Sequence, residues 1–294
     1  MSRLRLMRRL GARGYLRWMP GAMYLKLLYR SELGKKLNLK HPAAFNEKLQ
    51  WLKLHDRNSV YGVYADKYAV RAHIEKTLGA QYLIPLLGVY AEPGQIDWDA
   101  LPDRFVVKCT HGSHCSILCC DKAQFDRAAA VERLNRWLKK SWYWLGREWP
   151  YRCIEKPRVI VEEFLGNSDN PPPDCKVMCF DGTPRILQIH SKAASGGHAI
   201  DFYDMQGRLL PLRKCGFPNA GAEVLDMAPY GEMIGLAGRL SQGFAYLRAD
   251  FYLVDGRVYF GEMTFFDSSG LIDFEPEESN LFLGALLRLP GEAN

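Results

Sequence analysis

The chain has 294 residues, of which 48% are hydrophobic, 12% aromatic and 24% charged, and its formal net charge is +6. This composition excludes a disordered chain, and the length allows one large domain or two to three small lobes. No stretch approaches the roughly 20 apolar residues of a membrane-spanning helix, and arginines interrupt every short apolar run at the start, which argues against a secretory signal.

The first predicted element is a basic, helical N-terminal extension over residues 1–40. Eleven Lys and Arg residues lie there against one acid, Glu32, whereas residues 41–294 hold 28 basic and 32 acidic residues. Interleaved Leu, Met, Tyr and Trp suit contact with an anionic membrane that carries a lipid-linked acceptor, or with a polyanionic substrate. The alternative is a helix packed on the body with its arginines reaching solvent. Nucleic acid is not expected, because no recognised binding motif extends the patch.

Both helices and strands are predicted after this extension. In chain order, apolar periodicity and turn residues predict helices over 44–55 and 65–79, an apolar stretch at 82–89, strands at 104–109 and 116–120, an amphipathic helix over 126–143, strands at 158–164, 175–180, 185–190 and 199–203, a helix over 229–242, and a hairpin of strands 246–253 and 258–263. Asp-Gly pairs at 181–182 and 255–256 mark two tight turns. Hairpins alternating with helices indicate α+β lobes rather than a doubly wound sheet.

The last hairpin carries the strongest chemical signal. Period-two alternation puts Arg248 and Asp250 on one strand face, and Glu262 and Thr264 on a face of the partner strand. Pairing about the turn opposes residue i to about residue 511 minus i, which brings Asp250 within one step of Glu262. Opposed carboxylates repel unless a cation lies between them, and hard oxygen ligands favour Mg²⁺, with Mn²⁺ as an alternative. An edge hairpin with solvated acids is the other interpretation.

Two further stretches suggest contacts to a nucleotide. Lys108 ends an apolar strand and precedes a Gly-containing loop, 110–113, whose backbone N–H groups suit phosphate oxygens. A solvated surface lysine is the simpler interpretation. The stretch 159–166 runs from apolar residues into paired acids and a glycine, a pattern that suits an adenine slot or a strand that ends at the surface.

A soft-metal site is a separate hypothesis for the cysteine-rich stretch after Lys108. Its candidate ligands lie within eleven residues: Cys109, His111, His114, Cys115 and Cys119. No C-x₂-C or H-x₃₋₅-H pairing with suitable partners is present, so small buried cysteines are the favoured interpretation. The spacing of all eight cysteines differs from that of a small secreted scaffold, and we expect a reducing cytoplasm.

The order of several stretches resembles a known family. Asp66-Lys67 at a helix start is followed by FVVKCTHGS, VIVEEFLG, DCKVMCFDG and RADFYLVDGRVYFGEMTFFDSSG. In this order, over roughly residues 41–290, they resemble the TupA-like branch of the ATP-grasp superfamily. The resemblance implies ATP held between two α+β lobes, and a carboxylate activated as an acyl phosphate for attack by an amine or other nucleophile. It also implies a role in cell-surface polysaccharide or teichuronopeptide biosynthesis.

The resemblance further implies roles for individual residues at the nucleotide. Lys67 and Lys108 match two lysines that contact phosphate, and the flexible loop over the phosphates matches His111, Gly112 and Ser113. The inter-lobe segment that meets adenine matches Glu162, Glu163, Phe164 and Leu165. Asp174 is the candidate for the ribose hydroxyls, and Lys176 for a polar contact nearby.

At the catalytic end, the resemblance matches Arg248 to the arginine that stabilises the transferred phosphoryl group, and Asp250 and Glu262 to the magnesium carboxylates. Two positions depart from the pattern. Thr264 stands where an Asn often binds the metal, although its hydroxyl is also a ligand. His114 stands where the phosphate loop often has glycine, and it either stiffens the loop or, when protonated, adds a donor to phosphate.

The resulting expectation is an ATP- and Mg²⁺-dependent carboxylate–amine ligase, cytoplasmic or peripheral at the inner face of a membrane. Four segments are expected: the extension 1–40, a helical pre-grasp region 41–95, a small lobe 96–162 and a large lobe 163–294 with the metal site. A kinase that phosphorylates a sugar or other hydroxyl is the first alternative, because no motif separates the two reactions. A non-catalytic nucleotide-binding protein is the second.

Overall fold

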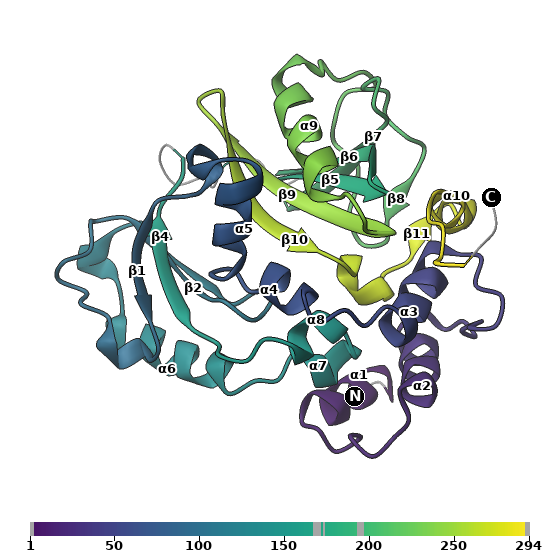
Figure 1. The fold of residues 1–294 in the computed structure, drawn as a ribbon, viewed down its shortest axis with the longest axis horizontal. Helices are drawn as coiled ribbons and strands as arrows, with labels where there is room; N and C mark the ends of the chain where they lie inside the picture. Colours follow the sequence, from purple (N-terminus) through teal and green to yellow (C-terminus); the bar gives the residue numbers. More distant parts are fainter. Residues whose placement is uncertain (1–2, 167–171, 173, 193–196, 292–294) are drawn as a thin grey trace. The chain divides into compact units, whose positions relative to one another are not determined.

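The computed structural model describes residues 3–166, 172, 174–192 and 197–291, whose helices and strands are drawn in Figure 1. The chain forms two compact units: unit 1 comprises residues 1–57 and 173–294, and unit 2 comprises residues 58–172. Each unit combines helices with antiparallel strands, which confirms the α+β class. The four segments expected from the sequence have boundaries different from those of the units.

Unit 2 is built on an antiparallel sheet of order β1-β4-β2-β3. Its elements are α4 (Tyr61–Ala65), α5 (Val70–Thr77), β1 (Leu86–Tyr90), β2 (Phe105–Cys109), β3 (Ser116–Cys119), α6 (Arg127–Leu138), α7 (Tyr143–Gly146), α8 (Trp149–Arg152) and β4 (Val159–Glu163). Alternate residues of β2 point into a core that α6 covers with Ala130 and Leu134. The helix predicted over 126–143 therefore forms, but it ends at Leu138.

Unit 1 is built on an antiparallel sheet of order β10-β9-β5-β6-β7. Its elements are α1 (Arg3–Ala12), α2 (Gly21–Leu33), α3 (Phe45–His55), β5 (Asp174–Phe180), β6 (Thr183–Lys192), β7 (His198–Tyr203), β8 (Arg213–Lys214), α9 (Gly231–Leu240), β9 (Tyr246–Val254), β10 (Arg257–Thr264), β11 (Phe274–Glu275) and α10 (Glu278–Leu286). Helix α9 contacts β5, β6 and β9, and β8 pairs with β11.

Both predicted Asp-Gly hairpins form. Asp181 and Gly182, between β5 and β6, have φ angles of 48° and 71°, and Asp255 and Gly256, between β9 and β10, have φ angles of 50° and 75°. Two successive positive φ angles are the requirement of a type I′ turn, which matches the twist of the flanking strands. The first turn joins β5 to β6 and the second joins β9 to β10, the strands that carry the polar residues described below.

A β-bulge at Gly261 shifts the register of the last hairpin by one residue from the predicted register. Tyr252 pairs with Tyr259, as the 511-minus-i rule requires, but beyond the bulge Asp250 pairs with Glu262. A Cβ at Gly261 would lie 3.0 Å from the backbone oxygen of Asp250, so a residue without a side chain suits the bulge. Because of this one-residue shift, Asp250 and Glu262 lie directly opposite each other, whereas the sequence predicted only that they lie close together.

Close packing of α10 on the start of α3 yields a stability prediction. A Cβ on Gly284 would lie 2.1 Å from the backbone oxygen of Ala43, whereas a Cβ on Gly235 of α9 would meet nothing within 4 Å. We expect Gly284→Ala to lower the free energy of unfolding by about 1–3 kcal/mol through overpacking. Gly235→Ala should leave it unchanged or raise it by up to about 1 kcal/mol. Urea unfolding of both variants checks this, and equal effects would contradict the packing.

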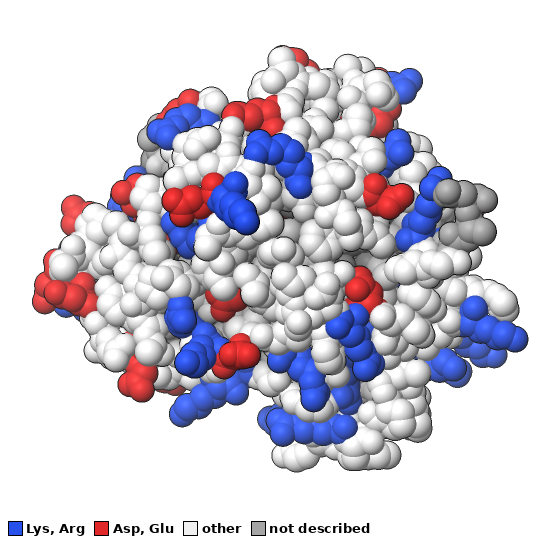
Figure 2. All heavy atoms as spheres, in the orientation of Figure 1, with Lys and Arg blue, Asp and Glu red and all other residues white. Residues whose placement is uncertain are grey.

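The basic N-terminal extension belongs to unit 1 and packs in part on the remainder of that unit. Met19, Tyr24, Leu25, Leu28, Tyr29 and Leu37 form a buried cluster with Leu271. Figure 2 shows Lys and Arg side chains gathered where Figure 1 draws α1 and α2. None of the helices in the described ranges combines the length and the apolar character needed to cross a bilayer.

Candidate functional site

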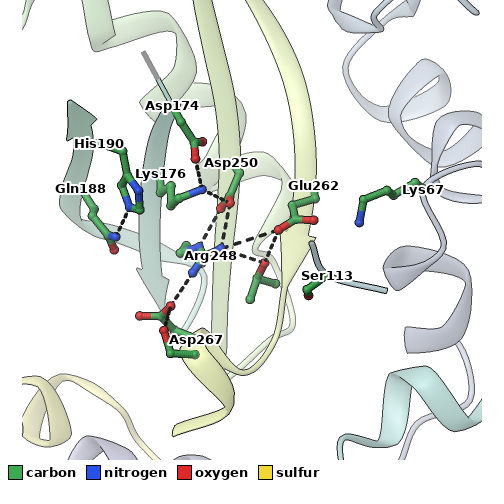
Figure 3. A network of polar contacts seen from close by, with 12 residues as sticks. Lys67, Ser113, Asp174, Lys176, Gln188, His190, Arg248, Asp250, Glu262 and Asp267 are labelled. Carbon is green, nitrogen blue, oxygen red and sulfur yellow. Dashed lines mark hydrogen bonds and ion pairs between the residues drawn. The ribbon is translucent and has the colours of Figure 1, made fainter. Parts of the chain in front are cut away.

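The centre of the candidate site in unit 1 is the guanidinium of Arg248 on β9 (Figure 3). Its Nε and Nη2 donate to the two carboxylate oxygens of Asp250 at 2.7 and 2.8 Å. Lys176 on the neighbouring strand β5 donates to Asp250 Oδ2 at 2.5 Å and lies 2.6 Å from Asp174 Oδ2. Two cations, Arg248 and Lys176, therefore share the buried carboxylate of Asp250. These ion pairs offset the cost of removing the carboxylate from water.

Strand β10 brings Glu262 and Thr264 to the same guanidinium. Arg248 Nη2 lies 3.2 Å from Thr264 Oγ1 and 3.8 Å from Glu262 Oε1. The Glu262 side chain is 33% exposed, whereas that of Asp250 is 4% exposed. Oxygens of three proposed metal ligands thus gather at one point of the sheet face, and Glu262 is more accessible than Asp250.

The donor set of this face is compatible with Mg²⁺. Across the described parts of the chain, no group of three or more His, Cys, Asp or Glu residues is arranged to hold a metal ion by itself. Mg²⁺ at nucleotide sites is commonly bound through one or two carboxylates together with phosphate oxygens and water. Two carboxylates and a hydroxyl on adjacent strands therefore fit an ion that arrives with a triphosphate.

A buried ion pair behind Arg248 was not predicted. Arg248 Nη1 also donates to Asp267, and Lys214 Nζ lies 2.9 Å from Asp267 Oδ2. The side chains of Lys214 and Asp267 are 4% and 1% exposed. No local sequence pattern predicts this ion pair, because Lys214 lies in the short strand β8, 53 residues before Asp267.

The charges of this cluster determine its pKa shifts. Burial would raise the pKa of Asp267, but Lys214 and Arg248 outweigh burial and hold that pKa below its usual range. Burial, aided by repulsion from Arg248, lowers the pKa of Lys214 even though Asp267 opposes this. Burial would also lower the pKa of Lys176, yet Asp250 keeps it above the usual value. Asp267 is thus charged, and the guanidinium of Arg248 is held by Asp250 on one side and Asp267 on the other.

A polar row continues from this cluster onto β6 and β7. Lys176 pairs in register with Gln188, whose buried amide nitrogen contacts His190 Nε2, and His190 Nδ1 lies 2.8 Å from His198 Nε2. Burial, with the nearby cations Lys176 and Arg248, lowers the pKa of His190 to about 2. His190 is therefore neutral at physiological pH. The spacing of these residues in the sequence gave no sign of a continuous row.

In unit 2, Lys108 is neither a free surface lysine nor an isolated cation. Its Nζ lies 2.7 Å from Glu162 Oε2 on the paired strand β4, and Arg71 Nη1 lies 3.1 Å from Glu162 Oε1. The Lys108 side chain is 15% exposed. Glu162, predicted at the adenine segment, thus bridges two cations, and sequence reasoning missed Arg71 because it lies in α5.

The proposed phosphate loop is anchored to the start of the helical region before α5. Thr110 Oγ1 donates to Asp66 Oδ2 at 2.7 Å, while Asp66 Oδ1 accepts from the N–H groups of Tyr68 and Ala69 at 2.9 and 2.8 Å. Lys67 Nζ donates to the carbonyl of Gly112 at 3.1 Å. Lys67 and Gly112, two of the predicted phosphate residues, are therefore in contact.

The packing and backbone angles of four loop residues show why the loop adopts this path. A Cβ on Gly112 would lie 2.2 Å from Trp142 Nε1, so the glycine is required by packing. Ser113 Oγ lies 3.1 Å from Tyr151 OH. His114 has a φ of 55°, in the left-handed region, which explains why glycine suits this position. His111 packs inside the unit near the carbonyl of Lys140, and burial lowers its pKa.

The remaining predicted residues of unit 2 lie at and after the end of β4. Glu163 is exposed, and its N–H donates to the carbonyl of Pro85 at 3.0 Å. The guanidinium of Arg104 lies 4.3 Å from the ring centre of Phe164, and Leu165 is partly buried. The cysteines of the soft-metal hypothesis, Cys109, Cys115 and Cys119, are buried in the core of the unit, and all eight cysteines are free thiols.

Comparison with known protein families gives one match. A family model described as TupA-like ATP-grasp matches residues 47–288. The matched range includes every residue proposed above for the nucleotide and the metal. No curated protein matches the sequence.

Several solved structures are similar at low identity. PsnB, an ATP-grasp ligase solved with a precursor variant, Mg and ADP, is 13% identical over 94% of this chain and 71% of its own, with a TM-score of 0.47. D-alanine–D-alanine ligase from Bacillus anthracis is 13% identical over 76% and 59%, with a TM-score of 0.41. N5-carboxyaminoimidazole synthase from Aspergillus clavatus is 11% identical over 78% and 53%, with a TM-score of 0.41. The matched part thus spans less than two thirds of the last two proteins.

Proposed function

The chain belongs to the TupA-like ATP-grasp family, and from that premise we propose that it is an ATP- and Mg²⁺-dependent ligase that joins a carboxylate to an amine or other nucleophile. A carboxylate oxygen attacks the γ-phosphorus of ATP and ADP leaves. The nucleophile then attacks the acyl carbon of the acyl phosphate, loses a proton, and releases phosphate. The resemblance in motif order suggests a substrate from cell-surface polysaccharide or peptide-polymer biosynthesis. An acceptor of that kind can be lipid-linked.

The observation that carries this proposal is the register of the last hairpin. The bulge at Gly261 sets Glu262 opposite Asp250, with Arg248 bound between them. Asp250, Glu262 and Thr264 would hold Mg²⁺, which when bound offsets the negative charge of the triphosphate. Arg248, fixed from behind by Asp267, supplies a preorganised positive charge for the transferred phosphoryl group. Asp174 lies at the edge of the same cluster, where we propose that it contacts ribose.

We further propose that the cluster of unit 2 binds ATP. Lys108 and Lys67 contact phosphate, the loop 111–113 covers it, and residues 162–165 meet adenine. Glu162 restrains Lys108 by an ion pair at 2.7 Å while Arg71 restrains Glu162, so the ammonium is held in place before ATP binds. Such preorganisation lowers the entropy lost on binding.

Product analysis tests the proposed reaction against its alternatives. Purified protein with ATP and Mg²⁺ is supplied with amino acids, amino sugars and uronic-acid precursors, singly and in pairs. A ligase releases ADP and phosphate in equal amounts with an amide or related acyl product. A kinase produces ADP and a phosphoester without free phosphate, and a binding protein retains ATP without turnover. Either of the last two outcomes would contradict the proposal.

Lys108→Met tests the role of the lysine in unit 2. We expect the affinity for ATP to fall by about 1.5–3 kcal/mol, because a charge-assisted hydrogen bond to phosphate is lost, while the affinity for AMP changes little. Calorimetric titration with both nucleotides measures the difference. Lys76→Met, at an exposed lysine of the same unit, is the control and should alter neither affinity. Equal binding of ATP by wild type and Lys108→Met would show that Lys108 serves only its ion pair.

A further inference from the structure

Helix α2 has apolar side chains on two faces, and only one of these faces is buried. Tyr24, Leu25, Leu28 and Tyr29 are buried in unit 1. On the opposite side, Met23 and Leu27, one helical turn apart, are 49% and 41% exposed. Exposing two large apolar side chains in one stripe gains nothing for an isolated chain in water.

The turn before α2 exposes two aromatic side chains as well. Tyr15 is 63% exposed and Trp18 is 74% exposed. Of the nine large hydrophobic side chains that are exposed among the described residues, these two, Met23 and Leu27 lie within thirteen residues. We call these four side chains the N-terminal face. Such a concentration marks an interaction surface rather than scattered surface hydrophobics.

Exposed basic side chains accompany the N-terminal face. Arg13, Lys26 and Arg30 are exposed, and Lys26 and Arg30 lie on the same stripe of α2 as Met23 and Leu27. Glu32 is the only acidic residue among residues 1–40. Figure 2 shows blue side chains with uncharged ones between them in the region where Figure 1 draws α1. The partner must therefore offer both negative charge and an apolar interior.

We propose that the N-terminal face docks on a bilayer that contains anionic lipids. Trp and Tyr favour the headgroup level, Met and Leu enter the acyl boundary, and Lys and Arg pair with lipid phosphates. A second copy of the chain is a poorer partner, because a symmetric contact would bring this basic face against itself. The proposal does not depend on the nucleotide, and it would hold a membrane-bound acceptor close to the enzyme.

Vesicle co-sedimentation of the full chain tests the proposal first on the wild type. We expect binding to vesicles of phosphatidylcholine with about one third phosphatidylglycerol and little binding to phosphatidylcholine alone. Binding should weaken when salt rises from about 0.1 to 0.5 M, since exposed charges are screened over about 10 Å or less in that range. No binding to anionic vesicles, or binding that salt leaves unchanged, would overturn the proposal.

Paired variants separate the apolar and charged contributions. Trp18→Ser with Leu27→Ser should reduce partitioning about tenfold or more. Arg13→Gln, Lys26→Gln and Arg30→Gln together should reduce partitioning about a hundredfold, at about fivefold per cation near an anionic surface. The control is Leu281→Ser with Phe282→Ser, an exposed apolar pair of α10 beside Glu277 and Glu278, which should bind as the wild type does.

Two outcomes among the variants contradict a membrane role. Equal loss in the control pair would show that any exposed apolar side chain drives binding. A concentration-dependent dimer in sedimentation velocity that disappears in Trp18→Ser with Leu27→Ser, without vesicle binding by the wild type, would make the face a contact between copies of the chain. All substituted positions are exposed, and an unchanged thermal transition confirms that the variants are folded.

Discussion

Glu262→Gln should lower Mg²⁺-dependent ATP turnover about a hundredfold or more while the fold stays intact. The substitution removes one negative charge from the proposed metal site, and metal stabilisation of transition-state charge is worth several kcal/mol. The Glu262 side chain is 33% exposed, whereas that of Asp250 is 4% exposed, so the substitution at Glu262 disturbs the buried charges less than one at Asp250. Steady-state rates over a Mg²⁺ titration, with a thermal transition as a fold check, measure this.

Asp250→Asn is the companion variant, and it should reduce both ATP turnover and the stability of the fold. Turnover should be lost as in Glu262→Gln, but the free energy of unfolding should also fall by about 3–5 kcal/mol, because Lys176 and Arg248 lose their shared buried carboxylate. Comparing the two variants separates the role of a carboxylate as a metal ligand, expected of both residues, from its role in holding buried cations, expected mainly of Asp250. Near wild-type rates at limiting Mg²⁺ in both variants would show that the metal ligands lie elsewhere.

The second large effect is expected at the pair behind Arg248. Asp267→Asn should lower the free energy of unfolding by about 3–5 kcal/mol, since it leaves Lys214 as an uncompensated charge in a buried site. Lys214→Met should lower it less, because Asp267 keeps its ion pair with Arg248. The double variant should lose less than the sum of the two. Urea unfolding of all four proteins gives the coupling. The control pair is Asp204 and Arg208, which lie 2.9 Å apart on the surface and should contribute less than about 1 kcal/mol.

The difference in stability between wild type and Asp267→Asn should depend on pH, and the direction follows from the pKa of Asp267. The pKa of Asp267 is lower in the folded chain than the value of about 4 expected when unfolded. The stability from its ionised form is thus present above about pH 4 and is lost as the pH falls. The gap in stability between wild type and Asp267→Asn should accordingly narrow below about pH 4. A gap that is constant from pH 7 to pH 3 would contradict the charged pair.

The sequence predicted local features well where one short-range rule decides them. The turns at Asp181 and Asp255 follow from the preference of Asp-Gly for positive φ, and the strands on either side follow from alternation. The approach of Asp250 to Glu262 followed from the same turn. Its one-residue error came from the bulge at Gly261, which is set by close backbone approach and not by the strand pattern.

Features that join distant stretches could not be predicted in this way. Lys214 meets Asp267 across 53 residues, and Arg71 meets Glu162 across 91 residues. Neither pair has a spacing rule, because sheet and loop packing alone bring the partners together. The grouping of residues 1–57 with 173–294 is of the same kind. The phosphate and metal roles rest on the order of motifs, and they remain predictions for the variants above.

Trapping of the activated carboxylate with hydroxylamine tests the central claim most directly. The protein is incubated with ATP, Mg²⁺, hydroxylamine and the carboxylates of the acceptor screen, with Glu262→Gln as the inactive control. We predict that one class of carboxylate yields a hydroxamate in an amount equal to the ADP released, and that Glu262→Gln yields none. ADP accompanied by a stable phosphoester, with no hydroxamate from any carboxylate, would contradict carboxylate activation and identify a phosphotransferase.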